Sequence, residues 1–164
     1  MPPLSILIWL PAFAGLLGAL SGALGTRGGS APAAPDGEPG PERAGGAWSL
    51  PGVLALIATL GALGLSIAYI ADYSPGHGLQ HVTDVVWISE LGIHYKVAIS
   101  GLNVFLVGLT TLLFAAATLA ANLRSWDRPR LFWFQFMLAE SAVLGAFLAQ
   151  DLALFVAFFD LMLI

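Results

Sequence analysis

The chain has 164 residues, of which 58% are hydrophobic and only 10% are charged, and its mean hydropathy is +0.85. A soluble domain carries charge on roughly a quarter of its residues, so this composition excludes a water-soluble protein and indicates a lipid bilayer as the surroundings. A net charge of −4 argues against a nucleic-acid partner, which would need a concentrated basic face. The sequence has no cysteine, which excludes disulfides, thiolate metal sites and cysteine-held iron–sulfur clusters.

Long apolar runs predict the transmembrane helices, because about 20 helical residues cross a hydrocarbon core of about 30 Å. We expect these helices within residues 1–25, 51–71, 97–121 and 131–149. A fifth run, 152–164, would give only about 20 Å of helix, so we expect it to be the start of a span in the N-terminal part of a longer membrane protein. The predicted fold is therefore all-α: a polytopic transmembrane helix bundle with about five hydrophobic segments, the last of them truncated.

The segments between these runs differ in composition. Residues 26–50 are rich in Gly, Pro and Ala, which predicts a flexible linker without a site. Residues 72–96 contain short alternating stretches around a glycine, which predicts a short external hairpin on the membrane surface. Residues 122–130 form a short loop. The first apolar run lacks the positively charged start of a secretory signal, so we expect it to stay in the protein as a helix.

Basic residues predict the orientation of the chain in the membrane. Five of the six Lys and Arg residues lie in the segments 26–50 and 122–130, and only Lys96 lies in the segment 72–96. The positive-inside rule places the two arginine-bearing loops in the cytoplasm. The N-terminus and the segment 72–96 are then expected outside.

Two features near the ends of the spans favour a structural interpretation. His77 and His81, with Asp84 nearby, have the spacing of helical metal ligands, but Pro and Gly residues among them break a helix. We therefore favour an exposed polar loop and predict no metal site. The aromatic stretch 132–136 is typical of an aromatic belt at the cytoplasmic interface of a membrane.

Glu140 and Asp160 are the ionisable side chains that fall inside the predicted spans. Glu140 lies about 13.5 Å from the outer end of its run and Asp160 about 12 Å from the outer start of the next, so both are expected near the midplane. A carboxylate there costs several kcal/mol and usually serves proton or ion transport. All six basic residues lie in loops, so a basic partner has to come from another segment or subunit. The alternative is that both carboxylates only join helices by hydrogen bonds.

Several stretches of the sequence resemble a known family in their order and spacing. They are LSILIWLP (4–11), WISELGIHY (87–95), ISGLN (99–103), GAFLAQDL (145–152) and FFDLMLI (158–164). This set is similar to subunit M of bacterial NADH-quinone oxidoreductase, the NADH dehydrogenase subunit 4 of respiratory complex I. The resemblance implies an antiporter-like, proton-translocating membrane subunit without a redox centre of its own.

The resemblance also implies roles for three carboxylates. In the family, a glutamate on the fifth helix couples to a lysine on a later helix, and Asp160 occupies the matching position. Glu140 matches a glutamate on the fourth helix of many members, and Asp151 matches an acidic residue between these two helices. The resemblance thus implies proton translocation by Glu140 and Asp160, with Asp151 as an accessory residue. Where the family usually has Asp-Gly-Leu-Ser, this chain has Ser-Gly-Leu-Asn at 100–103.

The resemblance further implies the setting in which the chain works. We expect no catalytic redox residue and no cofactor in this chain, with NADH, FMN, iron–sulfur clusters and quinone in partner subunits. The partners would be other membrane subunits of a complex I-type assembly and the lipid bilayer, in a bacterial inner membrane. The alternatives are a subunit of a multisubunit cation/proton antiporter and a structural membrane subunit without proton flux.

Overall fold

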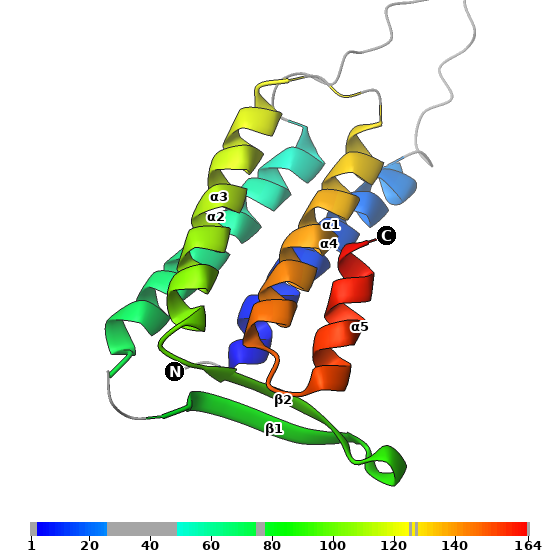
Figure 1. The fold of residues 1–164 in the computed structure, drawn as a ribbon. Coiled ribbons are helices and arrows are strands. Elements are labelled where there is room, and N and C mark those ends of the chain that lie inside the picture. The colour runs from blue at the N-terminus through cyan, green and yellow to red at the C-terminus, as the bar shows by residue number, and fades with distance from the viewer. Residues whose placement is uncertain (1–2, 26–48, 75–77, 125, 127, 164) are drawn as a thin grey trace, which may run out of the picture.

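The computed structural model describes residues 3–25, 49–74, 78–124, 126 and 128–163. Its elements are α1 (Leu4–Gly25), α2 (Leu50–Asp72), β1 (Gln80–Ile88), a 3₁₀ turn (Ser89–Leu91), β2 (Ile93–Ile99), α3 (Asn103–Asn122), α4 (Pro129–Leu148) and α5 (Leu152–Met162). Helices α1 to α4 lie side by side, the shorter α5 runs beside α4, and the two strands lie across one end of the bundle (Figure 1). The expected helix bundle and its hairpin are therefore confirmed.

Within the described residues, α1 to α4 are each long and apolar enough to cross a membrane, and α5 is a shorter apolar helix. The predicted linker at 26–50 falls almost wholly on residues outside the described part of the chain. Helix α2 begins just after Ser49, whose hydroxyl accepts a hydrogen bond from the Gly52 N–H, and Pro51 occupies the first turn, where a missing N–H costs nothing.

One expected boundary is wrong. The third helix was expected from residue 97, but residues 97–99 form the end of β2 and the helix begins at Asn103. The β-branched side chains of Val97 and Ile99 suit a strand, and the strand supplies buried apolar surface to the bundle end. An apolar run of this length contains both a buried strand and a helix, and its hydropathy alone does not separate them.

Asn103 fixes the point where β2 ends and α3 begins. Its Oδ1 accepts a hydrogen bond from Ser100 N at 2.7 Å, while its own N–H donates to Ser100 Oγ at 3.4 Å, which is a reciprocal cap on the first turn. Its Nδ2 donates to the Ala98 carbonyl at 2.9 Å and to the Phe147 carbonyl at 3.1 Å. One buried amide therefore joins β2, α3 and the last turn of α4.

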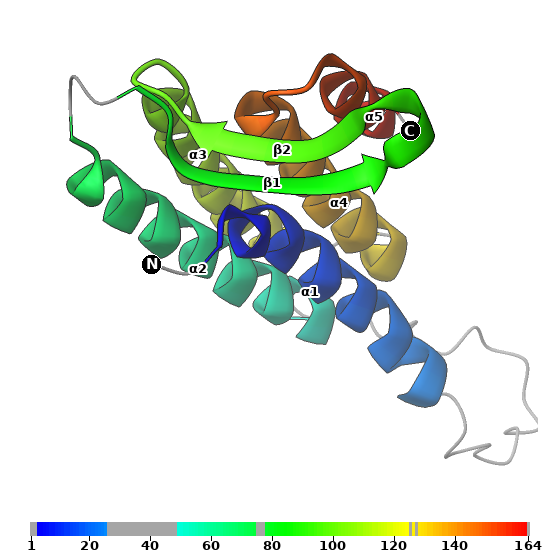
Figure 2. The same cartoon turned by 90° about the horizontal axis from the view of Figure 1, so that it is seen from below.

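The hairpin is held against the loop between α4 and α5 by backbone contacts. Strands β1 and β2 pair antiparallel, and Gly92 turns the chain between them with a φ of 65°. Val97 also forms an isolated bridge with Ala149, and Gln150 N donates to the Lys96 carbonyl at 2.8 Å. Viewed from below, the two strands extend across the ends of several helices (Figure 2).

Asp151 connects this loop to α5. Its Oδ1 accepts hydrogen bonds from Ala153 N at 2.8 Å and Leu154 N at 3.5 Å, so it caps the first turn of the helix. Its Oδ2 accepts a longer bond, 3.4 Å, from His94 N on β2. The hydrogen bond from Ala153 holds the pKa of Asp151 below its ordinary value of 3.8.

The buried apolar side chains form two clusters at opposite ends of the bundle. The first cluster lies beside the hairpin and includes Leu4, Leu7, Ala62, Val97, Val104, Leu144, Leu148 and Phe158. The second cluster lies toward the α3–α4 loop and consists of Ala55, Ala58, Ala121, Trp133 and Met137. Small residues allow the helices to approach closely: a Cβ at Gly15 would lie 2.8 Å from the Met137 Cβ.

Replacement of Asn103 by alanine tests its joining role. Asn103→Ala leaves the buried Ala98 carbonyl and the partly buried Phe147 carbonyl without this donor and removes the cap, so we expect the free energy of unfolding to fall by about 2 kcal/mol or more. Denaturant unfolding of the full-length protein in detergent measures it. Leu102→Ala is the matched control, because that neighbouring side chain is 76% exposed. Equal stability of the two variants would contradict the assignment.

Two replacements of Asp151 distinguish the effect of its hydrogen bonds to the first turn of α5 from the effect of its negative charge. Asp151→Ala should accelerate amide hydrogen exchange at Ala153 and Leu154 several-fold at neutral pH, whereas Asp151→Asn retains an accepting oxygen and should resemble the parent protein. In the parent, the stabilisation is complete above pH 3.8 and is lost as the pH falls through the lowered pKa. Exchange that is insensitive to both variants would argue against the cap.

Candidate functional site

Glu140 lies on the inward stripe of α4, between the two apolar clusters. The residues above and below it on this stripe are Met137, which belongs to the second cluster, and Leu144, which belongs to the first. The Glu140 side chain has 0% exposure, and neither carboxyl oxygen has a hydrogen-bond partner among the described residues. A buried carboxyl without a partner is rare in folded proteins, because buried polar groups are nearly always hydrogen-bonded.

Other buried polar side chains lie in the same middle region. We call Glu140, Ser141, Ser66 and Thr111 the polar layer, since each is at most 1% exposed. Thr59 and Thr118 are also buried and lie about 10.5 Å nearer the α3–α4 loop. The Ser66 and Thr111 hydroxyls are 2.8 Å apart and join α2 to α3. Thr111 also donates to backbone carbonyls of its own helix, whereas the Thr118 hydroxyl has no partner among the described residues. Buried polar side chains therefore lie at the height of Glu140, between the two apolar clusters.

Ser141 explains how α1 crosses this layer. Pro11 lies inside α1 and has no N–H, so the Leu7 carbonyl cannot accept the usual helical hydrogen bond. The next carbonyl, that of Ile8, accepts a hydrogen bond from Ser141 Oγ at 2.6 Å. This contact holds α4 against the proline-containing turn of α1, one residue away from Glu140.

Asp160 has different surroundings. Leu154 and Phe158 are the buried side chains of α5, and Asp160 lies about 200° around the helix from Phe158, on the exposed face. A side chain at Gly145 would collide with the Phe158 ring, which fixes the relative heights of α4 and α5. With Gly145 and Phe158 level, the heights of Asp160 and Glu140 along the bundle differ by about 5 Å or less. They do not share one cavity, because one carboxylate is exposed and the other is buried.

The observed contacts of Asp151 are those of the helix cap and of the link to β2 described above. An accessory role for it in proton movement stays a prediction.

The charged side chains of the hairpin form two separate groups. His81 Nε2 lies 2.9 Å from Asp72 Oδ2, whereas Asp84 pairs with His94 at 2.7 Å and with Lys96 at 3.6 Å. The hydrogen bond with His94 lowers the pKa of Asp84. His81 and Asp84 therefore have different partners, and His77, the third residue of the considered metal pattern, lies outside the described residues.

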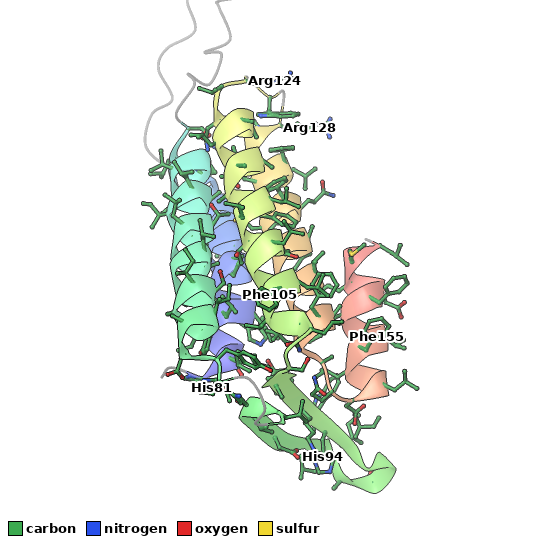
Figure 3. All side chains as sticks on the ribbon, turned by 60° about the vertical axis from the view of Figure 1, so that its left-hand side comes forward. His81, His94, Phe105, Arg124, Arg128 and Phe155 are labelled. Atoms are coloured by element: carbon green, nitrogen blue, oxygen red, sulfur yellow. The ribbon has the colours of Figure 1, made fainter. Side chains whose placement is uncertain are left out.

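The aromatic stretch at the start of α4 does more than line an interface. Trp133 is 2% exposed and packs in the second cluster, so the belt interpretation is wrong for this residue. Phe132 stacks on Trp126 with ring centroids 3.9 Å apart, and Phe136 meets Phe114 on α3 at 5.2 Å. The labelled Arg124 and Arg128 lie at this end of the bundle, opposite His81 and His94 (Figure 3).

The hydroxyl-bearing residues of α2 and α3 were not singled out from the sequence. Thr and Ser are common in membrane helices, where they bond to carbonyls of their own helix, so one such residue carries little information. The available signal was their spacing. Thr59 and Ser66 are seven residues apart, as are Thr111 and Thr118, and this spacing places each pair on one helix face.

The sequences of several known proteins show which family this chain resembles. No protein-family model matches the chain. It is 42% identical over 92 residues to the chloroplastic NAD(P)H-quinone oxidoreductase chain 4 of Staurastrum punctulatum, covering 54% of this chain and 17% of the relative. It is 34% identical over 108 residues to NADH-quinone oxidoreductase subunit M of Rhodobacter capsulatus, covering 65% of this chain and 20% of the relative.

A third relative, NAD(P)H-quinone oxidoreductase chain 4 of Synechococcus sp. (strain CC9605), is 36% identical over 112 residues, covering 67% of this chain and 21% of the relative. The chain therefore spans about a fifth of the length of the curated relatives it matches. The resemblance expected from the motifs is confirmed: subunit M and chain 4 proteins of quinone oxidoreductases are homologues of this chain.

Proposed function

We propose that this chain is part of a proton-translocating membrane subunit of the NADH-quinone oxidoreductase type, in which Glu140 takes up and releases a proton inside the membrane. The observation that carries the proposal is the carboxyl of Glu140, which is fully buried between two apolar clusters and has no hydrogen-bond partner among the described residues. Intramembrane carboxylates usually serve proton or ion movement. The names of the homologues support the same class.

The contacts of Glu140 favour proton exchange over a purely structural role. A carboxyl that only joined helices would use its oxygens in hydrogen bonds to another helix, as the hydroxyl of Ser141 does with Ile8. Neither oxygen of Glu140 does so within the described part of the chain. The relatives are named as quinone oxidoreductase components, which favours that assembly over a cation/proton antiporter.

Asp160 would serve as the second carboxylate of the pathway. Its helix exposes an apolar face that includes Phe155, Val156 and Phe159, and Asp160 interrupts this face. In a bilayer a charge there needs a partner. We assign that partner to a cationic side chain of a segment outside these residues or of another membrane subunit. Because Asp160 is one methylene shorter than glutamate, it reaches about 1.5 Å less far than the family's side chain would.

In this proposal the redox chemistry belongs to other subunits. NADH oxidation and quinone reduction would take place there, with FMN and iron–sulfur clusters, and would drive protons through this subunit. The arginine-bearing α3–α4 loop would lie in the cytoplasm and the N-terminus and hairpin outside a bacterial inner membrane, as the distribution of basic residues favours.

Replacement of the two carboxylates tests the proposal. In the full-length protein within its assembled complex, Glu140→Gln and Asp160→Asn should each reduce proton pumping to a small fraction of the parent level, because neither amide can carry a proton. NADH oxidation by the peripheral subunits should continue with an artificial acceptor. Pumping is measured in proteoliposomes as the proton gradient formed per NADH oxidised.

Glu90→Gln is the matched control, since Glu90 lies in the exposed turn of the hairpin. It should pump like the parent protein. Normal pumping by Glu140→Gln, with the complex assembled, would overturn the role assigned to Glu140.

A further inference from the structure

The interface between α2 and α3 carries polar side chains along its length. The α2 face presents Thr59 and Ser66, and the α3 face presents Thr111, Thr118 and Asn122, all nearly or completely buried. Most of the other residues buried along this interface are small or apolar. We call this line of polar side chains the α2–α3 seam.

Two hydrogen bonds fix how the seam is aligned. Asn122 Nδ2 donates to the Gly52 carbonyl at 3.1 Å near the loop end of the bundle, and the Ser66 and Thr111 hydroxyls meet at 2.8 Å farther inside. Thr59 lies seven residues from both Gly52 and Ser66. Because the two helices run antiparallel, Thr59 is level with Thr118, about 10.5 Å from the Ser66–Thr111 pair.

The Ser66–Thr111 pair, at the end of the seam farthest from the α3–α4 loop, is level with Glu140. The Phe114 and Phe136 rings are in contact, which sets the register between the antiparallel helices α3 and α4. Glu140 lies four residues after Phe136, and Thr111 lies three residues before Phe114. The two residues are therefore at nearly the same height in the bundle, about 5 to 6 Å from the aromatic contact.

The seam and the layer it enters contain polar atoms without partners. The hydroxyl of Thr118 and both carboxyl oxygens of Glu140 are completely buried and have no hydrogen-bond partner among the described residues. Buried polar groups that protein atoms leave unpaired are usually satisfied by ordered water. These atoms therefore point to water at two heights of the bundle. One is beside Thr118 on the seam, and the other is beside Glu140, where the seam ends.

The centre of the bundle is closed at the loop end. Trp133 and Met137 on α4 pack there against alanines of α2 and α3 and leave apolar surface on the direct route along α4. The seam passes beside this closure. Among the described residues it is the line of buried hydroxyl and amide groups that leads from the end bearing Arg124 and Arg128 (Figure 3) toward Glu140.

We propose that water molecules bind along the α2–α3 seam and connect the Glu140 carboxyl to the arginine-bearing end of the bundle. Each water or hydroxyl accepts one proton and passes one on, so a proton taken up at that end arrives at Glu140 and the seam itself is unchanged. The use of this route in pumping rests on the function proposed above, but the presence of water in the seam does not.

Valine is the informative replacement for Thr118, because it keeps the shape of the side chain and removes the hydroxyl. In the full-length protein within its complex, hydrogen–deuterium exchange of the Glu140 carboxyl is followed by infrared spectroscopy, with Glu140→Gln identifying the band. Thr118→Val should slow this exchange between about fivefold and tenfold, the change expected for loss of one hydrogen bond in the pathway.

Thr110→Val is the matched control on the same helix. Thr110 lies about 100° around α3 from the seam residue Thr111. Its hydroxyl donates to the Leu106 carbonyl of its own helix, and its loss should leave exchange at Glu140 unchanged. If Thr118→Val does not assemble, Thr118→Ala and Thr118→Ser replace it, and exchange should be slow with alanine and normal with serine. Equal exchange in the parent and in the variants lacking the hydroxyl would overturn the proposal.

The result separates the seam from the proposed function. If Thr118→Val slows exchange while Glu140→Gln still pumps, the seam carries water but Glu140 is not the pumping carboxyl. If Glu140→Gln stops pumping while Thr118→Val exchanges like the parent, the function stands and the seam is not the route.

Discussion

Inside a bilayer no external water is available, so every polar group of the chain has to find its partner within the protein or in bound water. This requirement explains most of the polar contacts described above. Asn103 satisfies carbonyls where a strand gives way to a helix, and Ser141 bonds to a carbonyl beside the proline of α1. Asp151 caps α5 at the exposed turn. The helices end and change direction where such partners exist.

Against this background three described side chains stand out, because buried polar atoms of Glu140, Thr118 and, on β2, Tyr95 have no hydrogen-bond partner among the described residues. Glu140 lies in the middle of α4, and Thr118 lies one turn before the end of α3. A carboxyl held in this way keeps its capacity to bind and release a proton, whereas one held by several donors would be fixed in one state. The two apolar clusters on either side of Glu140 would keep water from crossing the bundle freely, which a proton-translocating subunit needs.

The sequence was most informative where length and charge decide the structure. The apolar runs predicted the spanning helices, and the scarcity of charge made Glu140 and Asp160 stand out before any contact was known. Their surroundings were not predictable, since burial of Glu140 and exposure of Asp160 depend on how α4 and α5 pack. The strand at Val97 was missed because a buried strand and a buried helix are equally apolar. That Thr59 and Thr118 lie at the same height follows only from the register of α2 on α3, which a single sequence does not supply.

Proton exchange at Glu140 by way of the α2–α3 seam requires that its carboxyl be linked to water inside the bundle. An electron cryomicroscopy map of the assembled complex, at a resolution that shows ordered water, tests this claim most directly. We expect water density within hydrogen-bonding distance of a Glu140 carboxyl oxygen and of Thr118 Oγ1, on the side facing α2 and α3. A dry layer, in which both Glu140 oxygens bond directly to protein groups, would contradict it.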